Sequence, residues 1–512
     1  MIASETETLG LLLDGKKRPS ATTEYSDIYD PSTGQVIARA AMATAAEVDL
    51  AVASAKAAFP AWAATPAMKR VQVLYRFREL IEAHQDELTR MVCTENGKVW
   101  GEALGDVLKA KEVVEFACGI PSLMMGESLM DASSGFDTTL YREPLGVFAG
   151  IAPFNFPAMI PMGWITPLAI ATGNTLVLRP SPVTPMTSIR MTELLYEAGL
   201  PKGVVNLVTC GASEAEHLVK HPDVKGITFV GSTAVGMKVY ATAAAHGKRV
   251  QALCQAKNHA LVLADAALER TARGIINGGL GCAGERCMAL PVAVVEESVA
   301  DELAALLVKF AQERKIGPAY DQSSELGPVV TEKHRQSVTR WVERGVEEGA
   351  ELILDGRGAT VAGFEKGFYL GPCIFDHVKP GMSVGDDEIF GPVMLIKRVK
   401  NFEEGLELMN ANQYANGSVI FTQNGGRARE FTRRTHAGMV GVNVGIPVPV
   451  GIFPFAGHKS SFFGDLHALG KDGIRFYTES KCVTSTWFDE EEMRNAKVDT
   501  WDGMLTGRNR SK

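Results

Sequence analysis

Short apolar stretches alternate with helical segments through the middle of the chain, and this alternation restricts the possible folds more than any other feature. Strand-like residues cover 137–152. Further strands are expected at 175–178, 204–208, 226–230 and 260–263, and helices at 157–171, 185–198, 212–219 and 233–245. Strands that alternate with helices form parallel βαβ units. We therefore predict an α/β fold with a doubly wound sheet.

A second alternating block begins near residue 270 and predicts a second α/β domain. Its strands are expected at 292–295, 351–354, 393–398, 417–421 and 441–443, and its helices at 298–312, 332–348 and 402–411. Ahead of both blocks, a hairpin-like turn at 11–16 precedes four helices, at about 44–58, 66–84, 85–95 and 98–117. The first of these begins with the capping-box spacing of Thr44 and Glu47. These helices predict a surface layer.

The overall charge and the cysteine spacing argue against several classes of function. A net charge of −8 gives no general attraction to nucleic acid or to anionic membranes. The apolar run from 147 to 170 is interrupted by prolines and glycines, so no membrane span is expected. The eight cysteines form no Cys-x-x-Cys pair and no zinc-like spacing, which predicts reduced thiols and no metal site. The acidic N-terminus lacks the pattern of a targeting peptide, which predicts a cytoplasmic protein.

The stretch Gly-Cys-Ala-Gly-Glu-Arg-Cys-Met at 281–288 contains a candidate nucleophile. Cys287 follows a glycine-rich turn and is preceded by Arg286, and a neighbouring cation favours the reactive thiolate. The structural alternative is that Cys287 is a small buried hydrophobic residue. A second local signal is the strand, glycine turn and helix start at 229–236, where backbone N–H groups can face a phosphate.

Taken together, the motifs resemble those of the aldehyde dehydrogenase superfamily. Four of them occur in its order and rough spacing: Pro-Phe-Asn-Phe-Pro at 153–157, Phe-Val-Gly-Ser at 229–232, Gly-Glu-Arg-Cys at 284–287 and Glu-Ile-Phe-Gly-Pro at 388–392. The match covers about residues 10–490. Within the superfamily the chain looks like the methylmalonate-semialdehyde dehydrogenases, the CoA-acylating branch, on the stretches 157–161, 247–252, 256–259, 286–290, 446–449 and 460–462.

The resemblance implies a division into domains. A Rossmann-type dinucleotide-binding domain would comprise 8–127 and 148–258, and an α/β catalytic domain 259–460. A small β oligomerisation arm would comprise 128–147 and 474–490, so a homodimer or homotetramer is expected. The last stretch, 491–512, is polar and charged and is expected to form a tail.

The resemblance also implies the roles of individual residues. Cys287 attacks the aldehyde, and the Asn155 amide and the Cys287 N–H hold the resulting oxyanion. Glu388 binds the nicotinamide ribose and Phe390 lies against the ring. The other expected cofactor-binding positions are Ala152, Pro153, Phe154, Arg179, Ser181, Gly231, Ser232 and Leu253. From the residues alone, Asn155 also fits a helix cap, and Glu388 also fits a solvated loop carboxylate.

Two positions bear on the cofactor and on the acyl acceptor. Arg179-Pro180-Ser181-Pro182 stands where the superfamily usually has Lys-Pro-Ser-Glu. The missing glutamate makes NADP possible, and NAD is expected because the resemblance to the CoA-acylating branch implies it. Hydrolytic relatives carry a glutamate that activates water, and alignment on Lys257 puts Leu253 there, which cannot accept a proton. The expected function is therefore oxidation of malonate or methylmalonate semialdehyde with NAD through a Cys287 thioester. CoA takes the acyl group, and carbon dioxide is lost.

The substrate carboxylate would be held by Arg286 and by Lys109, which stands where the branch has an arginine. Lysine keeps the charge but loses the bidentate fork, and the structural alternative for Lys109 is a surface helix lysine. Gln255 replaces a glycine, and Glu285 replaces a glutamine and would raise the pKa of Cys287 if it pointed inward. Two other functions therefore stay open: a hydrolytic NAD(P)-dependent dehydrogenase of another acidic aldehyde, and a catalytically weakened homologue that binds nucleotide.

Overall fold

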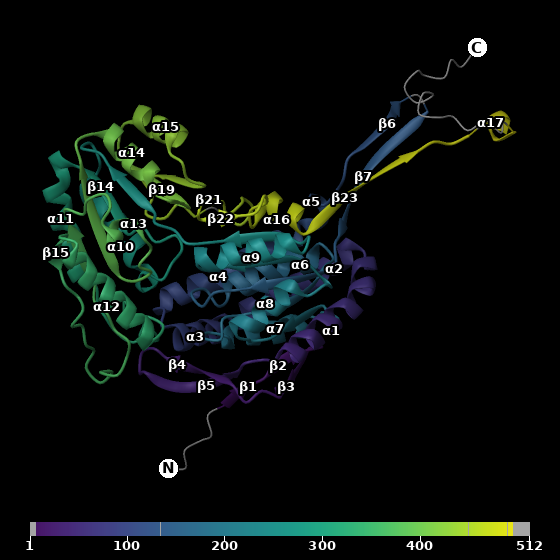
Figure 1. Cartoon of the computed structure of the whole chain (residues 1–512), viewed down its shortest axis with the longest axis horizontal. Coiled ribbons are helices and arrows are strands. Elements are labelled where there is room, and N and C mark those ends of the chain that lie inside the picture. Colours follow the sequence, from purple (N-terminus) through teal and green to yellow (C-terminus); the bar gives the residue numbers. More distant parts are fainter. Residues whose placement is uncertain (1–6, 134, 449, 489, 495–512) are drawn as a thin grey trace.

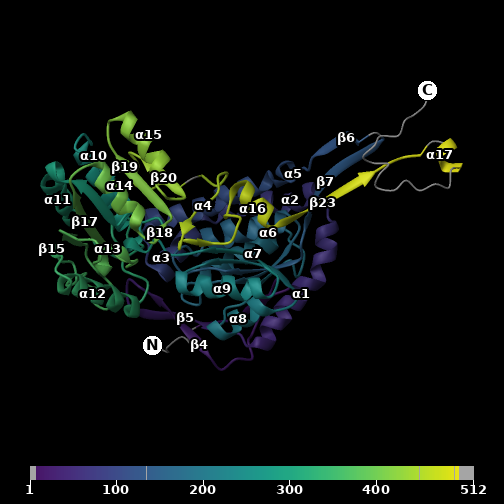
Figure 2. The same cartoon turned by 45° about the horizontal axis from the view of Figure 1, so that its top comes forward.

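A computed structural model describes residues 7–133, 135–448, 450–488 and 490–494. Two sheets with their helices lie side by side, and a narrow arm extends away from one of them (Figures 1 and 2). This arrangement confirms the predicted α/β fold class.

The first sheet has eight strands, and its central five are parallel. In spatial order these are β12 (Arg249–Leu253), β11 (Val224–Val230), β8 (Val147–Ile151), β9 (Thr175–Arg179) and β10 (Val205–Leu207). The helices α6 (Thr166–Ala171), α7 (Met186–Glu197), α8 (Ala212–Lys220) and α9 (Thr233–Ala245) follow in the predicted alternation.

Strand β12 was not predicted from the sequence. It alternates polar with apolar residues and lies next to the short edge strand β22 (Phe462–Phe463). Its polar side chains find backbone partners: Gln251 donates to the Leu466 carbonyl at 2.8 Å, and Arg249 donates to three carbonyls between residues 475 and 478. These partners lie more than 200 residues away, so the local pattern carried no sign of them.

The second sheet has seven strands. Their order is β15 (Glu351–Leu354), β16 (Cys373–Asp376), β17 (Val393–Val399), β14 (Val292–Glu296), β13 (His259–Val262), β19 (Gly417–Phe421) and β20 (Met439–Val442). The expectation that the second block begins near residue 270 was wrong, because β13 pairs with β14 and β19 in this sheet. The block thus begins with β13, and the short strand β16 was missed.

The N-terminal region forms the predicted hairpin and helices. The hairpin joins β2 (Leu11–Leu13) to β3 (Lys16–Arg18), and the helices are α1 (Ala45–Ala64), α2 (Ala67–Ala83), α3 (Gln85–Asn96) and α4 (Trp100–Cys118). Both hydrogen bonds of the Thr44–Glu47 capping box are present. Helix α1 runs past the predicted end at residue 58, and its buried Trp62 donates to the Ile170 carbonyl at 3.0 Å.

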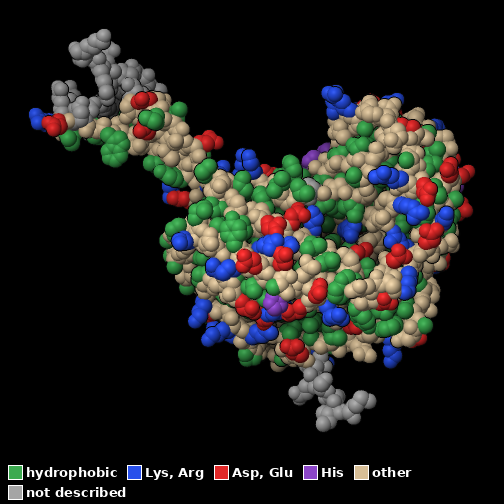
Figure 3. Space-filling model, turned by 180° about the vertical axis from the view of Figure 1, so that it is seen from behind, with side chains coloured by type: hydrophobic (Ala, Val, Ile, Leu, Met, Phe, Trp, Pro, Cys, Tyr) green, Lys and Arg blue, Asp and Glu red, His purple; other side chains and the backbone are tan. Residues whose placement is uncertain are grey.

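The arm is a separate antiparallel sheet of β6 (Ser128–Ser133), β7 (Phe136–Pro144) and β23 (Thr478–Ser485). Leu129 and Met130 on the arm are largely exposed, and hydrophobic side chains are visible along it (Figure 3). The short helix α17 (Glu490–Arg494) follows β23, and the rest of the predicted polar tail, 495–512, lies outside the described residues.

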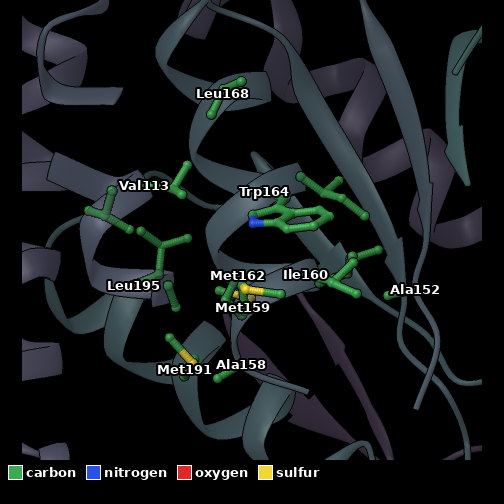
Figure 4. Close-up of a cluster of buried hydrophobic side chains, with 14 of the residues drawn as sticks. Val113, Ala152, Ala158, Met159, Ile160, Met162, Trp164, Leu168, Met191 and Leu195 are labelled. Atoms are coloured by element: carbon green, nitrogen blue, oxygen red, sulfur yellow. The ribbon is translucent and has the colours of Figure 1, made fainter. Parts of the chain in front are cut away.

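A buried apolar cluster supports the segment that carries Asn155. The π-helix η1 (Met159–Ile165) is buried throughout and contributes Met159, Ile160, Met162 and Trp164 to the cluster (Figure 4). The predicted helix at 157–171 thus forms as η1 followed by α6, and Thr166 donates across the wide turn to the Pro161 carbonyl at 2.7 Å. The core therefore fixes the chain directly after β8, where the candidate site begins.

Candidate active site

Cys287 lies in a loop after the 3-10 helix η2 (Gly281–Gly284). Gly284 adopts a left-handed backbone with φ of 72°. A Cβ at this position would collide with the Gly391 carbonyl oxygen. The nucleophile loop therefore packs directly against the 388–392 segment, and both requirements explain the glycine.

Hydrogen bonds to its backbone fix the direction of Cys287. The Asn258 amide donates to the Cys287 carbonyl at 3.0 Å and to the Ala289 carbonyl at 2.7 Å. The Asn416 amide donates to the Cys287 carbonyl at 3.4 Å. The sulfur in turn lies close to the backbone N–H groups of Cys287 and Met288, which stabilise a thiolate.

The pKa of the Cys287 thiol is nevertheless raised to about 12. Burial is the largest cause, and the negative charge of Glu388 adds to it. The Arg286 guanidinium lowers the pKa of Cys287, but by less than burial raises it. The neighbouring arginine thus favours the thiolate as expected, but desolvation has the larger effect on the pKa of Cys287.

Asn155 meets the nucleophile loop from the first sheet. It is 3% exposed, and its Nδ2 donates to the Glu285 carbonyl at 3.1 Å. An amide nitrogen carries two N–H groups, so one is used in this bond and the second can serve an oxyanion. The preceding carbonyl, of Phe154, accepts from Asn96 at 3.0 Å and from Thr184 at 2.9 Å, which holds the loop in place.

A cavity of about 420 Å³ opens beside Cys287. Its walls are mainly apolar and include Phe156, Met159, Trp164 and Phe455. The charged residues that line it are Glu102, Asp106, Lys109, Glu112 and Arg286. The structure thus brings Lys109 and Arg286, the two cations expected to hold a carboxylate, to the same cavity as the nucleophile.

The two cations have different partners. Lys109 forms an ion pair with Glu112 at 2.6 Å, and Glu112 also accepts from the Gly451 N–H at 2.9 Å. Arg286 donates to the Cys282 sulfur at 3.2 Å, and the Glu102 carboxylate stabilises its charge. Arg286 is therefore held by two groups that sequence reasoning did not single out.

Most of the expected cofactor-binding residues follow the carboxyl ends of neighbouring parallel strands. Ala152, Pro153 and Phe154 follow β8, Gly231 and Ser232 follow β11, Arg179 and Ser181 end or follow β9, and Leu253 ends β12. This edge of a doubly wound sheet is where ligands bind in such folds. Helix α9 begins here, with Ser232 at its N-cap, so its first N–H groups face the same edge. The Arg179 guanidinium donates two hydrogen bonds to the Cys210 carbonyl, at 2.7 and 3.2 Å, and does not line the cavity beside Cys287.

Glu388 and Phe390 reach this edge from the second sheet. Glu388 accepts from the Ala256 N–H at 3.0 Å and lines a small cavity together with Cys287. Phe390 has a left-handed backbone (φ 61°). Its ring packs edge-on against the Phe154 ring, with 5.9 Å between the ring centroids. A carboxylate and an aromatic ring therefore face the nucleophile loop from one side, while the 420 Å³ cavity opens on another.

This arrangement agrees with a comparison of the whole chain with known families. The aldehyde dehydrogenase family model matches residues 18–483. The chain belongs to the aldehyde dehydrogenase family.

The relatives of this aldehyde dehydrogenase extend over nearly its whole length. Malonate-semialdehyde dehydrogenase 2 of Geobacillus thermodenitrificans is 47% identical over 94% of this chain and 99% of its own. A putative methylmalonate-semialdehyde dehydrogenase from Sinorhizobium meliloti, solved in complex with NAD, superposes with a TM-score of 0.93 at 43% identity, covering 95% of this chain and 99% of its own. The methylmalonate-semialdehyde dehydrogenase from Oceanimonas doudoroffii superposes with a TM-score of 0.93 at 40% identity and covers 96% of this chain and 100% of its own. The resemblance seen in the motifs is confirmed.

Glu285 does not point at the nucleophile in this aldehyde dehydrogenase. Its carboxyl group accepts from the Val330 N–H at 3.1 Å and lies 3.4 Å from the His334 ring. Burial raises the pKa of Glu285 well above its usual range. His334 in turn bonds to the Phe390 carbonyl at 2.7 Å. The concern that Glu285 would raise the pKa of Cys287 is not supported, because Glu285 is not among the main causes of that shift.

Sequence reasoning missed several residues that shape the site, namely Glu102, Asn258, Cys282 and His334. Asn258 lies in the Ala-Lys-Asn-His stretch that had been noted only for its resemblance. Cys282 lies in the 281–288 stretch, four residues before its partner Arg286, whereas Glu102 and His334 have no local pattern, since their roles depend on contacts across elements. Throughout the described ranges, no three His, Cys, Asp or Glu residues are grouped to hold a metal ion. No helix in residues 7–133, 135–448, 450–488 and 490–494 is long and apolar enough to cross a membrane.

We predict that Glu388→Gln lowers the pKa of Cys287 by about one pH unit, the low end of what a nearby charge produces. Burial raises the pKa of Glu388 to about 7, so above that pH the wild-type carboxylate is charged and opposes the thiolate. The rate at which iodoacetamide alkylates Cys287, followed by peptide mass spectrometry, should therefore rise at lower pH in the variant. Asp387→Asn is the matched control, because the Asp387 carboxylate accepts from Gln413. An unchanged or raised pKa in Glu388→Gln would contradict the assignment.

Proposed function

We propose that this chain oxidises malonate or methylmalonate semialdehyde with NAD and transfers the acyl group to CoA. The observation that carries the proposal is Leu253. It ends β12, is 4% exposed, and stands where a hydrolytic enzyme needs a base. The names of the relatives and the NAD complex of one of them support the same substrate class and cofactor.

The residues present fit a dinucleotide. The N-terminus of α9 offers N–H groups to a diphosphate, and the Glu388 carboxylate can accept from ribose hydroxyls. When bound, NAD supplies the hydride acceptor. Arg179 replaces the usual lysine and Pro182 the usual glutamate, so NADP remains a possible second cofactor.

Cys287 and its neighbours carry out the reaction of the aldehyde. The Cys287 thiol gives its proton to solvent and its sulfur adds to the aldehyde carbon, which turns the carbonyl oxygen into an oxyanion. The second Asn155 N–H and the Cys287 N–H stabilise that oxyanion. Loss of hydride from the same carbon leaves a thioester on Cys287. The thiolate of CoA then attacks the thioester carbonyl, and Cys287 is released as the leaving group.

The substrate carboxylate would be bound by Arg286, with Lys109 at the mouth of the same cavity. A carboxylate β to a thioester carbonyl can leave as carbon dioxide, and the carbon it leaves takes up a proton. Malonate semialdehyde would thus yield acetyl-CoA, and methylmalonate semialdehyde propionyl-CoA. Small organic substrates fit the 420 Å³ cavity.

We also propose a cytoplasmic homodimer or homotetramer that assembles through the arm of β6, β7 and β23. The exposed Leu129, Met130, Tyr141 and Val483 on this arm support the idea, because a row of apolar residues on a projecting sheet favours a protein partner. Light scattering should give two or four times the chain mass of 55.1 kDa, and a monomer would contradict the proposal.

A second candidate is hydrolysis of the thioester to a free acid. The observation in its favour is Glu388, a carboxyl group with a pKa of about 7 whose charge acts on Cys287. Glu388 is, however, engaged by the Ala256 N–H. Free acid formed at the rate of NADH, without CoA, would favour this candidate.

The proposal predicts CoA-dependent turnover of malonate semialdehyde. Purified protein with NAD and the aldehyde should give at most one NADH per subunit without CoA, and sustained NADH with acetyl-CoA when CoA is present. NADH is followed by absorbance and the products by mass spectrometry. Cys287→Ala should be inactive in both conditions. Equal rates with and without CoA would contradict the acyl transfer, and NADP is tested in parallel.

Arg286→Gln should weaken the binding of a carboxylated substrate about tenfold to a hundredfold. A hydrogen bond to a charged group contributes about 1.5–3 kcal/mol, and about 1.4 kcal/mol corresponds to a factor of ten. The KM for malonate semialdehyde should rise accordingly, while that for propionaldehyde, which lacks a carboxylate, should stay within about twofold. Lys111→Gln is the matched control, because Lys111 pairs with Glu82 and does not line the cavity. Equal effects on both substrates would contradict a carboxylate-binding role.

A further inference from the structure

Gln255 lies between two groups that the proposed function assigns to the coenzyme, and the inference below rests on that proposed function. Its side-chain Oε1 accepts from the Thr233 N–H at 3.0 Å. Its own N–H donates to the Thr233 hydroxyl at 3.3 Å. The two residues therefore form a reciprocal pair across 22 positions of the sequence.

Thr233 is the first residue of the thirteen-residue helix α9. The first N–H groups of a helix have no acceptor within the helix and are the ones that bind phosphate. The Ser232 N-cap makes no side-chain capping bond, so the Gln255 amide oxygen satisfies the Thr233 N–H instead. The Thr233 hydroxyl also donates to the Ser460 carbonyl at 3.0 Å, which holds this residue in position.

The same amide reaches the carboxylate expected to bind the nicotinamide ribose. A hydrogen bond from the Gln255 side chain holds the pKa of Glu388 below the value that burial alone would give. The next residue, Ala256, donates its N–H to Glu388 at 3.0 Å. A glutamine amide carries both an acceptor and two donors, so one side chain can join a helix N-terminus to a carboxylate.

We propose that Gln255 is a coenzyme latch: in the free protein its amide occupies the α9 N-terminus and Glu388, and it must turn away for the dinucleotide to bind. Its side chain is partly exposed and has free rotation about three bonds, so this movement needs no change in the backbone. A ligand that must displace an internal competitor binds more weakly, because part of its binding free energy is used to break the competitor's contacts. Gln255 therefore weakens the binding of both NAD and NADH and speeds the release of NADH.

The opposite role is physically reasonable and gives the opposite result. If Gln255 turned only slightly, its amide could donate to the bound dinucleotide and strengthen binding. Removal of the side chain distinguishes the two roles, because a latch raises coenzyme affinity when it is lost and a ligand contact lowers it.

The test measures NAD and NADH binding to the full-length protein by calorimetry, and NADH release by stopped-flow fluorescence. Gln255→Ala should lower both dissociation constants about tenfold, which corresponds to about 1.4 kcal/mol, and should slow NADH release by a similar factor. Gln413→Ala is the matched control, since Gln413 is an exposed glutamine whose side chain donates to Asp387. Its affinities should match the wild type.

An unchanged or weaker affinity in Gln255→Ala would overturn the latch. Circular dichroism and the melting temperature check that the variant folds, and Gln255→Gly repeats the measurement with the glycine that the resemblance places at this position. If the wild type binds NAD and Gln255→Ala binds it no better, only the latch fails. If neither protein binds NAD or NADP, the proposed function fails as well.

Discussion

The site depends on the short crossover at 254–258, which leaves the first sheet at β12 and enters the second at β13. Asn258 ends it, and its buried amide donates to the carbonyls of Cys287 and Ala289 while its Oδ1 accepts from the Gly417 N–H at 2.8 Å. One side chain thus ties the nucleophile loop to the second sheet. The other contacts of the crossover run from Cys254 to Ser461, from Gln255 to Thr233, from Ala256 to Glu388 and from Lys257 to Val384. Cys287, Glu388 and helix α9 are therefore positioned by five consecutive residues.

The burial that this packing produces has two opposite consequences. It raises the pKa of Cys287 to about 12, so the free protein keeps its nucleophile protonated. The same exclusion of water protects a thioester once it has formed, and the buried Leu253 at the end of β12 offers no base. A protein that delivers an acyl group to a thiol gains from a slow reaction of its thioester with water. Burial of Cys287 therefore both disfavours the thiolate and slows hydrolysis of the thioester.

The sequence predicted those parts of the molecule that local patterns determine. The alternating strands and helices of both blocks, the Thr44 capping box and the motifs at the ends of β8 and β11 are all in place, because each depends on neighbours within a few residues. Strand β12 was missed because its polar residues are satisfied by distant carbonyls. The direction of Glu285 and the pKa of Cys287 were likewise beyond sequence reasoning, since they depend on Val330 and Glu388, which lie far along the chain.

The central claim is that the acyl group waits on Cys287 until a thiol removes it. The most direct measurement is mass spectrometry of the intact protein after mixing with NAD and malonate semialdehyde in the absence of CoA. The account predicts an acyl adduct, malonyl or, after loss of carbon dioxide, acetyl, that maps to the Cys287 peptide, persists for minutes, and disappears as acetyl-CoA forms when CoA is added. Release of free acid with no adduct on Cys287 would contradict it.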